Sequence, residues 1–485
     1  MNPVPDRGPQ VASLPEPEIP SLRLQVAVVV HLAVLLVFTT WAFGGNVAWA
    51  RTAAAVLASG GVILTAIHLA GRPPVEIAKT LLRSLWPLLA LNVVVLAGLF
   101  NPSFGTILMD GEVLARRLRE VPHLPTTARP SVSLQALWVF DATVLSCFNL
   151  YLIVRRRRLL RTLLVAVTLN AVLLAVFGTL QYLARSPGLY FGAVGTPQPY
   201  FFATFIYHNH WGAYALLMIA ATLAIAWGLF RSNRGRDRLH SPVLTFVVAA
   251  LLVAVTVPMS GSRSCTVCAA LLLVFALVHL VVVWLKSRRS ARGTALPLLA
   301  GLALVGAFGA VVFDAARPML AVRAETTRLQ LRAAHFGGEL GARPSLYRDT
   351  ARMALAKPLF GWGMGSYPVA FQIFNRRDRQ DRWAGLAAPP IYYVDAHSDW
   401  LQSLAELGFV GTALVILLAA VPALSLRNIP TVGPLPLFLL AGCGLVAVYA
   451  AVEFPFGNLA VVQSWWLCYY TAIGYLRLGA AEAGA

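Results

Sequence analysis

Residues 389–411, PPIYYVDAHSDWLQSLAELGFVG, combine titratable side chains with the start of an apolar segment. His397 lies between Asp395 and Asp399, where an imidazole that faces water titrates near neutral pH and could act as a general base. Asp395 or Ser398 could cap the helix that follows, and Asp399 suits the positive end of the helix dipole. This stretch is therefore the first candidate for an active site.

Gln402 and Glu406 follow Asp399 at helical spacing, so the three side chains form a polar stripe on an otherwise apolar segment. An acid within a membrane segment needs a partner or a function. Asp395, His397 and Asp399 could alternatively supply metal ligands. The neighbouring segment is strongly cationic, which disfavours a bound metal, so none is expected.

Three arginines are candidates for binding an anion. Arg263 lies in the turn PMSGSRSC, where a lone cation at membrane depth is costly unless it is used or reaches lipid phosphate. Arg348 and Arg352 lie one turn apart in an expected helix, so they could converge on one ligand or form a solvated face paired with Asp349. Because a guanidinium binds phosphate through two nitrogens and keeps its proton, pyrophosphate is the natural partner.

A further cluster lies in residues 200–214, YFFATFIYHNHWGAY, at the outer end of an expected membrane segment. Asn209 and His210 occur there among aromatic residues. Aromatic faces with polar tips suit sugar rings, but an aromatic belt at the membrane interface has the same composition. The sequence leaves both interpretations open.

The composition indicates the class of protein to which these candidate residues belong. Of 485 residues, 58% are apolar and 12% are charged, and the mean hydropathy is +0.70, which excludes an ordinary soluble globular protein. The net charge of +19 does not indicate nucleic-acid binding, because the arginines lie in loops between apolar segments. The chain is therefore predicted to be an all-α, polytopic membrane protein with membrane lipids as its surroundings.

About twelve apolar segments approach or exceed the roughly 20 residues that cross a hydrocarbon core. They lie near residues 24–43, 50–70, 83–100, 134–154, 159–182, 210–230, 242–259, 266–285, 295–313, 400–424, 434–452 and 459–478. Basic residues are dense on alternate connections, which predicts that those connections and both termini are cytoplasmic. The outward connection 101–133 carries Arg116, Arg117 and Arg119, which we expect on an interfacial amphipathic helix.

This topology divides the chain into five parts. They are a disordered cytoplasmic tail (1–21), transmembrane helices 1 to 9 (22–313), an extracytoplasmic and mainly helical catalytic loop (314–399), transmembrane helices 10 to 12 (400–478) and a cytoplasmic tail (479–485).

Several of these motifs together resemble the O-antigen ligase and polymerase family of membrane glycosyltransferases, over about residues 195–425. The segment HSDWLQSLAELGFVG is similar to the family signature His-Asn-x-x-Leu-Gln-x-x-x-Glu-x-Gly-x-x-Gly, with Ser398 in place of the asparagine. KPLFGWGMGSY resembles the Pro-x-x-Gly-x-Gly turn, SGSRS resembles the Ser-Arg element, and ATFIYHNHWGAY resembles the Thr-Phe-x-x-x-Asn-His segment.

The resemblance implies a GT-C-like, metal-independent transferase that needs no cofactor. Its donor would be a glycan on undecaprenyl pyrophosphate at the outer face of the bacterial cytoplasmic membrane, and its acceptor a glycan or a lipid. The family's essential histidine falls on His397 and its arginines on Arg263 and Arg348, with Arg352 as a third candidate. Asp395, Asp399 or Glu406 would orient the imidazole. The alternatives are a transporter or flippase of lipid-linked sugars, or a structural subunit of an envelope assembly complex.

Overall fold

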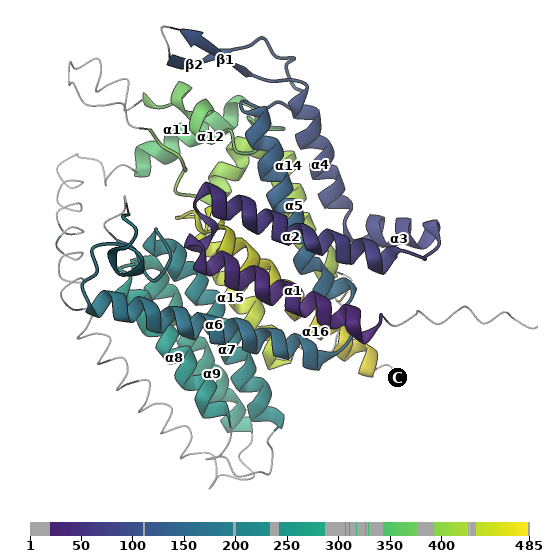
Figure 1. Ribbon diagram of the computed structural model, residues 1–485, viewed down its shortest axis with the longest axis vertical. Coiled ribbons are helices and arrows are strands. Elements are labelled where there is room, and N and C mark those ends of the chain that lie inside the picture. Colours follow the sequence, from purple (N-terminus) through teal and green to yellow (C-terminus); the bar gives the residue numbers. More distant parts are fainter. Residues whose placement is uncertain are drawn as a thin grey trace, which may run out of the picture.

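The computed structural model of the chain is largely helical, as predicted (Figure 1). It describes residues 20–109, 112–196, 200–232, 242–286, 343–376, 392–424 and 433–483, with isolated residues at 306, 310, 317, 325, 328 and 426. The polytopic membrane class is also confirmed, because seven described helices are long and apolar enough to cross a membrane.

Among the described residues, ten long helices make up the bundle. They are α1 (Leu22–Trp41), α2 (Ala48–Leu69), α5 (Pro130–Leu152), α6 (Arg157–Leu183), α7 (His208–Ser232), α8 (Val243–Met259), α9 (Arg263–Lys286), α14 (Asp399–Leu424), α15 (Pro434–Tyr449) and α16 (Leu459–Ala483). α7 lies at the centre, since 83% of the residues in its most apolar stretch are buried, against 11% for the corresponding stretch of α9. It packs against α6, α8, α9, α15 and α16.

Eleven of the predicted spans coincide with helices, the ten of the bundle and α4 (Trp86–Leu99). α4 is preceded by a separate amphipathic helix, α3 (Pro74–Ser84), and the two meet at an angle of 80°. The predicted span 295–313 lies outside the described residues, apart from 306 and 310. Most of the predicted N-terminal tail also lies outside them, whereas residues 479–483 of the predicted C-terminal tail continue α16. The total of twelve spans therefore stays a prediction.

The prediction of an amphipathic helix around Arg116, Arg117 and Arg119 is wrong. Instead, β1 (Phe104–Met109) and β2 (Glu112–Arg117) pair as antiparallel strands, with Phe104 opposite Arg117. The sequence Asp-Gly between the two strands is a strong hairpin signal, and it outweighs the basic run that favoured an interfacial helix. Arg116 and Arg117 thus lie on β2, and Arg119 follows it.

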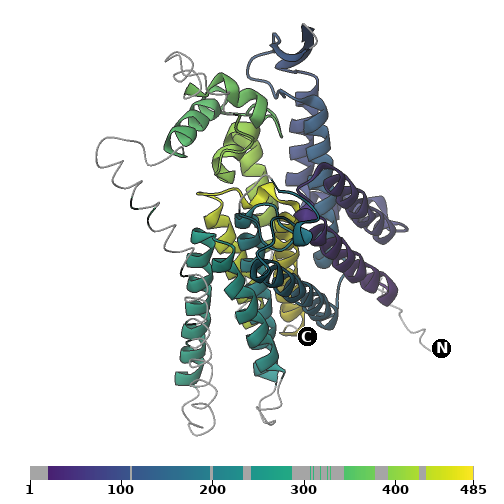
Figure 2. The same cartoon turned by 60° about the vertical axis from the view of Figure 1, so that its left-hand side comes forward.

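Two short helices, α11 (Arg343–Ala356) and α12 (Tyr367–Ala370), cover one end of the bundle. They lie with the hairpin at the end opposite to the C-terminal ends of α7 and α9 (Figure 2). Short 3-10 turns complete the connections at Phe43–Gly45 (η1), Tyr190–Gly192 (η2), Phe371–Ile373 (η4) and Pro455–Gly457 (η5). Leu346, Met353, Trp362, Tyr367 and Phe371 belong to a separate small core under α11.

α14 is broken at Gly408, whose φ is 64° and ψ is −169°. The carbonyls of Ala405 and Glu406, which the break leaves without helical partners, accept hydrogen bonds from the backbone amides of Trp362 and Gly363 at 3.0 and 2.8 Å. The glycine-rich turn therefore completes the first half of the broken helix.

The second half of α14 is held in the same way. The amides of Phe409 and Val410 donate to the carbonyls of Pro358 and Leu359 at 2.7 and 3.0 Å. A Cβ at Gly408 would lie 2.4 Å from the carbonyl carbon of Leu359, so only glycine permits this approach. The turn and the broken helix thus form one interlocked unit next to His397.

Candidate active site

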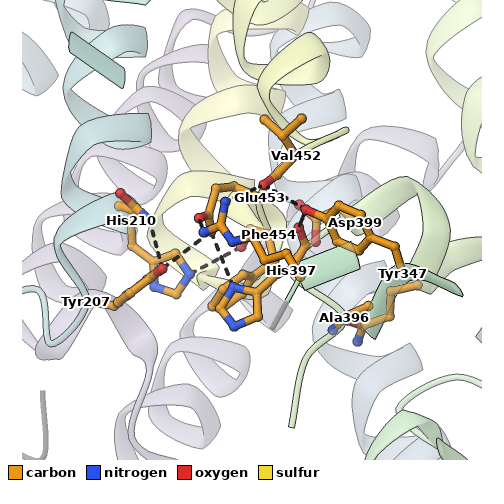
Figure 3. Close-up of polar contacts among 12 residues, drawn as sticks. Tyr207, His210, Tyr347, Ala396, His397, Asp399, Val452, Glu453 and Phe454 are labelled. Atoms are coloured by element: carbon orange, nitrogen blue, oxygen red, sulfur yellow. Dashed lines mark hydrogen bonds and ion pairs between the residues drawn. The ribbon is translucent and has the colours of Figure 1, made fainter. Parts of the chain in front are cut away.

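His397 lies in the connection that leads into α14. Its φ of +54° is in the left-handed region, which is uncommon for a residue other than glycine and is maintained only when the surroundings impose it. The hydroxyl of Tyr347 on α11 donates to the His397 carbonyl at 2.8 Å. The imidazole packs edge-on against Phe454, with ring centroids 4.7 Å apart. Tyr347 thus holds the backbone of His397, and Phe454 packs against its ring (Figure 3).

Glu453, between α15 and η5, is the carboxylate that faces the imidazole. Its Oε2 lies 3.6 Å from Nδ1 of His397, which is too long for a hydrogen bond but close enough for an ion pair with a protonated ring. Glu453 is 2% exposed and His397 is 31% exposed. The other carboxylate oxygen, Oε1, is paired with the guanidinium of Arg343 on α11. Glu453 faces His397 (Figure 3) and thus links it to the positive charge of Arg343.

The two acids nearest His397 have pKa values shifted in opposite directions. Burial alone would raise the pKa of Glu453, but the proximity of His397 and the charge of Arg343 outweigh burial and lower it. Burial raises the pKa of Asp395, and the charges of His397 and Arg51 only partly offset this. Glu453 is therefore the acid whose ionised form the site stabilises.

The side chains predicted to orient His397 mostly accept hydrogen bonds from backbone amides. Ser398 Oγ accepts from the Leu401 amide at 3.4 Å, which is the predicted helix cap. Asp399 Oδ2 accepts from the Phe456 amide at 2.8 Å. These contacts fix the start of α14, and with it the position of His397, relative to η5.

Gln402 and Glu406 act further along the predicted polar stripe. Gln402 Oε1 accepts from the amide of Ala396, next to His397, at 2.9 Å. The Glu406 carboxylate accepts from the amides of Gly365 and Tyr367 at 3.1 and 2.7 Å. The stripe therefore positions the loop that carries His397, while Glu453 is the acid in contact with the ring.

Asn209 and His210, at the start of α7, join the same network. The His210 Nε2 lies 3.2 Å from the carbonyl of Phe454, and the two rings pack edge-on. Asn209 Nδ2 donates to the hydroxyl of Tyr207 at 2.8 Å, and that hydroxyl donates to Glu453 Oε2 at 3.4 Å. Tyr207 also stacks on Phe454, with centroids 5.2 Å apart. The sequence cluster around α7 is thus part of the site, and its sugar-binding role stays a prediction.

Arg263 is exposed at the first position of α9. The turn that carries it packs on α7, because Cys265 Sγ lies 3.9 Å from the Asn209 carbonyl. A Cβ at Gly212 would lie 2.7 Å from the same sulfur, so α7 and α9 approach closely here. The Ser-Arg element is thereby held against the segment that contains Asn209.

Arg348 and Arg352 lie on α11, and they differ. Arg348 is exposed and directly follows Tyr347, the residue bound to the His397 carbonyl. Arg352 forms an ion pair with Asp349 at 2.7 Å, and Asp349 also accepts from the Arg376 amide at 3.0 Å. The pairing with Asp349 is the alternative that the sequence left open, and it is observed for Arg352.

Sequence reasoning missed Glu453, Arg343, Tyr207, Tyr347 and Phe454. One signal for Glu453 was available, since it is the single acid in the connection between two apolar segments and an acid at that depth needs a partner. No comparable signal distinguished Arg343 from the other arginines of residues 314–399.

The fold and the site define a polytopic helical membrane protein with an acid–histidine pair at one end of its bundle. A family model described as O-antigen ligase matches residues 248–416, a segment that contains Arg263, Arg348, His397 and Glu406. The match covers about a third of the chain and supports the resemblance to the O-antigen ligase family, which implies a ligase-like or polymerase-like membrane glycosyltransferase. No curated protein matches the chain.

Proposed function

We propose that the protein transfers a glycan from an undecaprenyl-pyrophosphate carrier to an acceptor hydroxyl on the outer side of the cytoplasmic membrane. The acceptor is a second glycan or a lipid. In this proposal the bundle has twelve spans and a GT-C-like arrangement, both termini are cytoplasmic, and residues 314–399 are extracytoplasmic. The observation that carries the proposal is the buried Glu453 carboxylate beside Nδ1 of a half-exposed histidine.

His397 is the general base in this mechanism. Because Nδ1 faces Glu453, the acceptor approaches Nε2, which accepts the proton of its hydroxyl. The acceptor oxygen forms a bond to the anomeric carbon while the bond from that carbon to the pyrophosphate oxygen breaks. A single displacement of this kind inverts the anomeric configuration. Glu453 stabilises the imidazolium that results, much as the acid of a catalytic triad does.

Arg263 and Arg348 bind the leaving pyrophosphate, whose charge increases as the bond breaks. Both side chains are exposed next to elements of the site, which suits a ligand that arrives from the membrane. Arg352 retains its ion pair with Asp349. Since guanidinium groups supply the positive charge, the proposed reaction needs neither a metal nor a cofactor.

His397→Ala tests the role of the base in purified protein with a lipid-linked donor and acceptor. A general base typically contributes about 100-fold to 10,000-fold, so turnover falls by this amount while the protein stays folded. His397→Asn should be compared, because asparagine tolerates the left-handed backbone at this position.

The matched control is His123→Asn, at another histidine with a positive φ, here 64°, whose side chain is exposed. It should retain wild-type turnover. Wild-type rates in both His397 variants would remove this residue from the mechanism.

A transporter of the same lipid-linked sugar is the second candidate, because broken membrane helices are common in transporters. In α14, however, the backbone groups next to the break are bonded to residues 358–363, so they are not open to a substrate. Liposomes that contain only this protein, donor and acceptor distinguish the two. A new glycosidic product supports the transferase, and movement of intact donor without product supports the transporter.

A further inference from the structure

Three guanidinium groups from distant segments gather at the far end of α5. Arg155, after α5, donates from Nη1 to the Tyr151 carbonyl at 3.2 Å. Arg477 of α16 donates from Nη2 to the Val154 carbonyl at 3.3 Å, and its guanidinium lies 4.5 Å from the centre of the Tyr151 ring. Arg72, after α2, is close enough to Arg155 for the two charges to repel each other. We call Arg72, Arg155 and Arg477 the basic cluster.

Among the residues that the structure describes, the basic cluster has no countercharge. Arg155 and Arg477 also repel each other. In the described part of the chain, no carboxylate forms an ion pair with any of the three arginines, and all three are half-buried. Burial, with repulsion from Arg72 adding to it, lowers the pKa of Arg155. Gathering like charges away from bulk water is unfavourable unless an anion joins them.

His68 of α2 is a second buried group in this region. It is 7% exposed, and its Nε2 has no hydrogen-bond partner among the described residues. It is close enough to both Arg72 and Arg155 to interact with their charges. A buried polar nitrogen without a partner among the described residues, next to two of these cations, indicates that an acceptor is missing from this region.

The basic cluster lies about one membrane thickness from the candidate active site. The first turn of α5 contacts the glycine-rich turn, since Ser133 donates to the Met364 carbonyl. The 23 residues of α5 rise about 35 Å from there to the cluster. The cluster also lies just beyond Leu69 and Leu152, the last residues of two apolar helices, which is the depth of lipid head groups.

We propose that the basic cluster binds the phosphate group of an anionic phospholipid. Each guanidinium has five N–H donors, and the described contacts of Arg155 use one and those of Arg477 two, so several remain for phosphate oxygens. Binding neutralises the repulsion among the three cations and ties α2, α5 and α16 together at this end. The competing explanation is that Arg155 and Arg477 only cap the carbonyls at the end of α5.

The test measures lipid binding by purified, full-length protein, using native mass spectrometry and thermal unfolding in detergent. The ligands are cardiolipin, phosphatidylglycerol, phosphatidylcholine and inorganic phosphate. The variants are Arg155→Gln and Arg477→Gln, with Arg477→Lys to retain charge and a donor towards Val154. The matched control is Arg158→Gln, which removes a nearby exposed arginine from the first turn of α6.

We expect the anionic lipids to bind and stabilise the wild type, and phosphatidylcholine and inorganic phosphate to do neither. Arg155→Gln and Arg477→Gln should each weaken binding at least about fivefold, Arg477→Lys less, and Arg158→Gln by less than about twofold. Equal loss in all variants would indicate general surface charge and overturn the proposal. Stabilisation of the wild type by inorganic phosphate alone would overturn it too. So would Arg155→Gln and Arg477→Gln variants that unfold more easily but bind anionic lipid as tightly as the wild type.

Discussion

Replacing Glu453 with glutamine removes one negative charge beside His397 and keeps the shape of the side chain. The carboxylate lies 3.6 Å from Nδ1, and it is 2% exposed. Two charges about 4 Å apart at an effective dielectric constant of 20 attract by about 4 kcal/mol. The imidazolium that forms in the transition state receives less than this, because His397 is 31% exposed and Arg343 shares the carboxylate.

A loss of about 3 kcal/mol is therefore expected in the transition state, which corresponds to about 100-fold in kcat. KM for the donor should change little, because in the proposed mechanism Glu453 faces an uncharged imidazole until the proton is transferred. The fold should persist, since Arg343 is 46% exposed and water can solvate it when its partner is neutral.

The assay is single-turnover glycan transfer in nanodiscs, followed for wild type, Glu453→Gln and Glu120→Gln. Glu120 is a fair control because it is also a carboxylate paired with a cation, Lys357, outside the His397 network. Wild-type kcat in a folded Glu453→Gln protein would refute the view that this acid stabilises the protonated histidine. An equal loss in Glu120→Gln would attribute the effect to general instability.

Three further predictions follow from other parts of the structure. Gly408→Ala should destabilise the protein by about 3 kcal/mol or more, because φ is +64° and the new Cβ would lie 2.4 Å from Leu359, whereas Gly444→Ala faces open space and should change stability by about 1 kcal/mol or less. Similar unfolding midpoints for the two variants would contradict the interlocked turn. Burial raises the pKa of Asp395, so its contribution to stability is full below the ordinary pKa of 3.8 and is lost as pH rises through the higher folded value. Asp395→Asn should therefore raise Tm at pH 7 but not below pH 3.8, and a gain that does not vary with pH would count against burial as the cause. Arg263→Gln and Arg348→Gln should each lower kcat/KM for the donor by about 10-fold to 100-fold, while Arg352→Gln loses only a half-exposed pair with Asp349 and should stay within about threefold; equal losses in steady-state assays would place Arg352 in the donor site as well.

The helices of the bundle could be predicted because hydropathy and length are local properties. A run such as residues 24–43 must be helical if it crosses a bilayer, since lipid offers no hydrogen-bond partners for an open backbone. The pairing of β1 with β2 could have been predicted from the sequence Asp-Gly between the two strands, but the basic run of Arg116, Arg117 and Arg119 favoured an interfacial helix. The break at Gly408 was not predictable in this way, because it depends on backbone partners from residues 358–363.

The sequence by itself determined which residue types the site would use: a histidine with acids around it, arginines in the connections, and a helical membrane frame. Only the tertiary structure decided that Glu453, from a connection two helices further along the chain, is the acid beside His397. It also decided that Arg352 is paired with Asp349. The side chains of Asp399, Gln402 and Glu406 accept hydrogen bonds from backbone amides. The physical reason is that side-chain chemistry is local, whereas the contact that sets a charge or orients a ring depends on how distant helices pack.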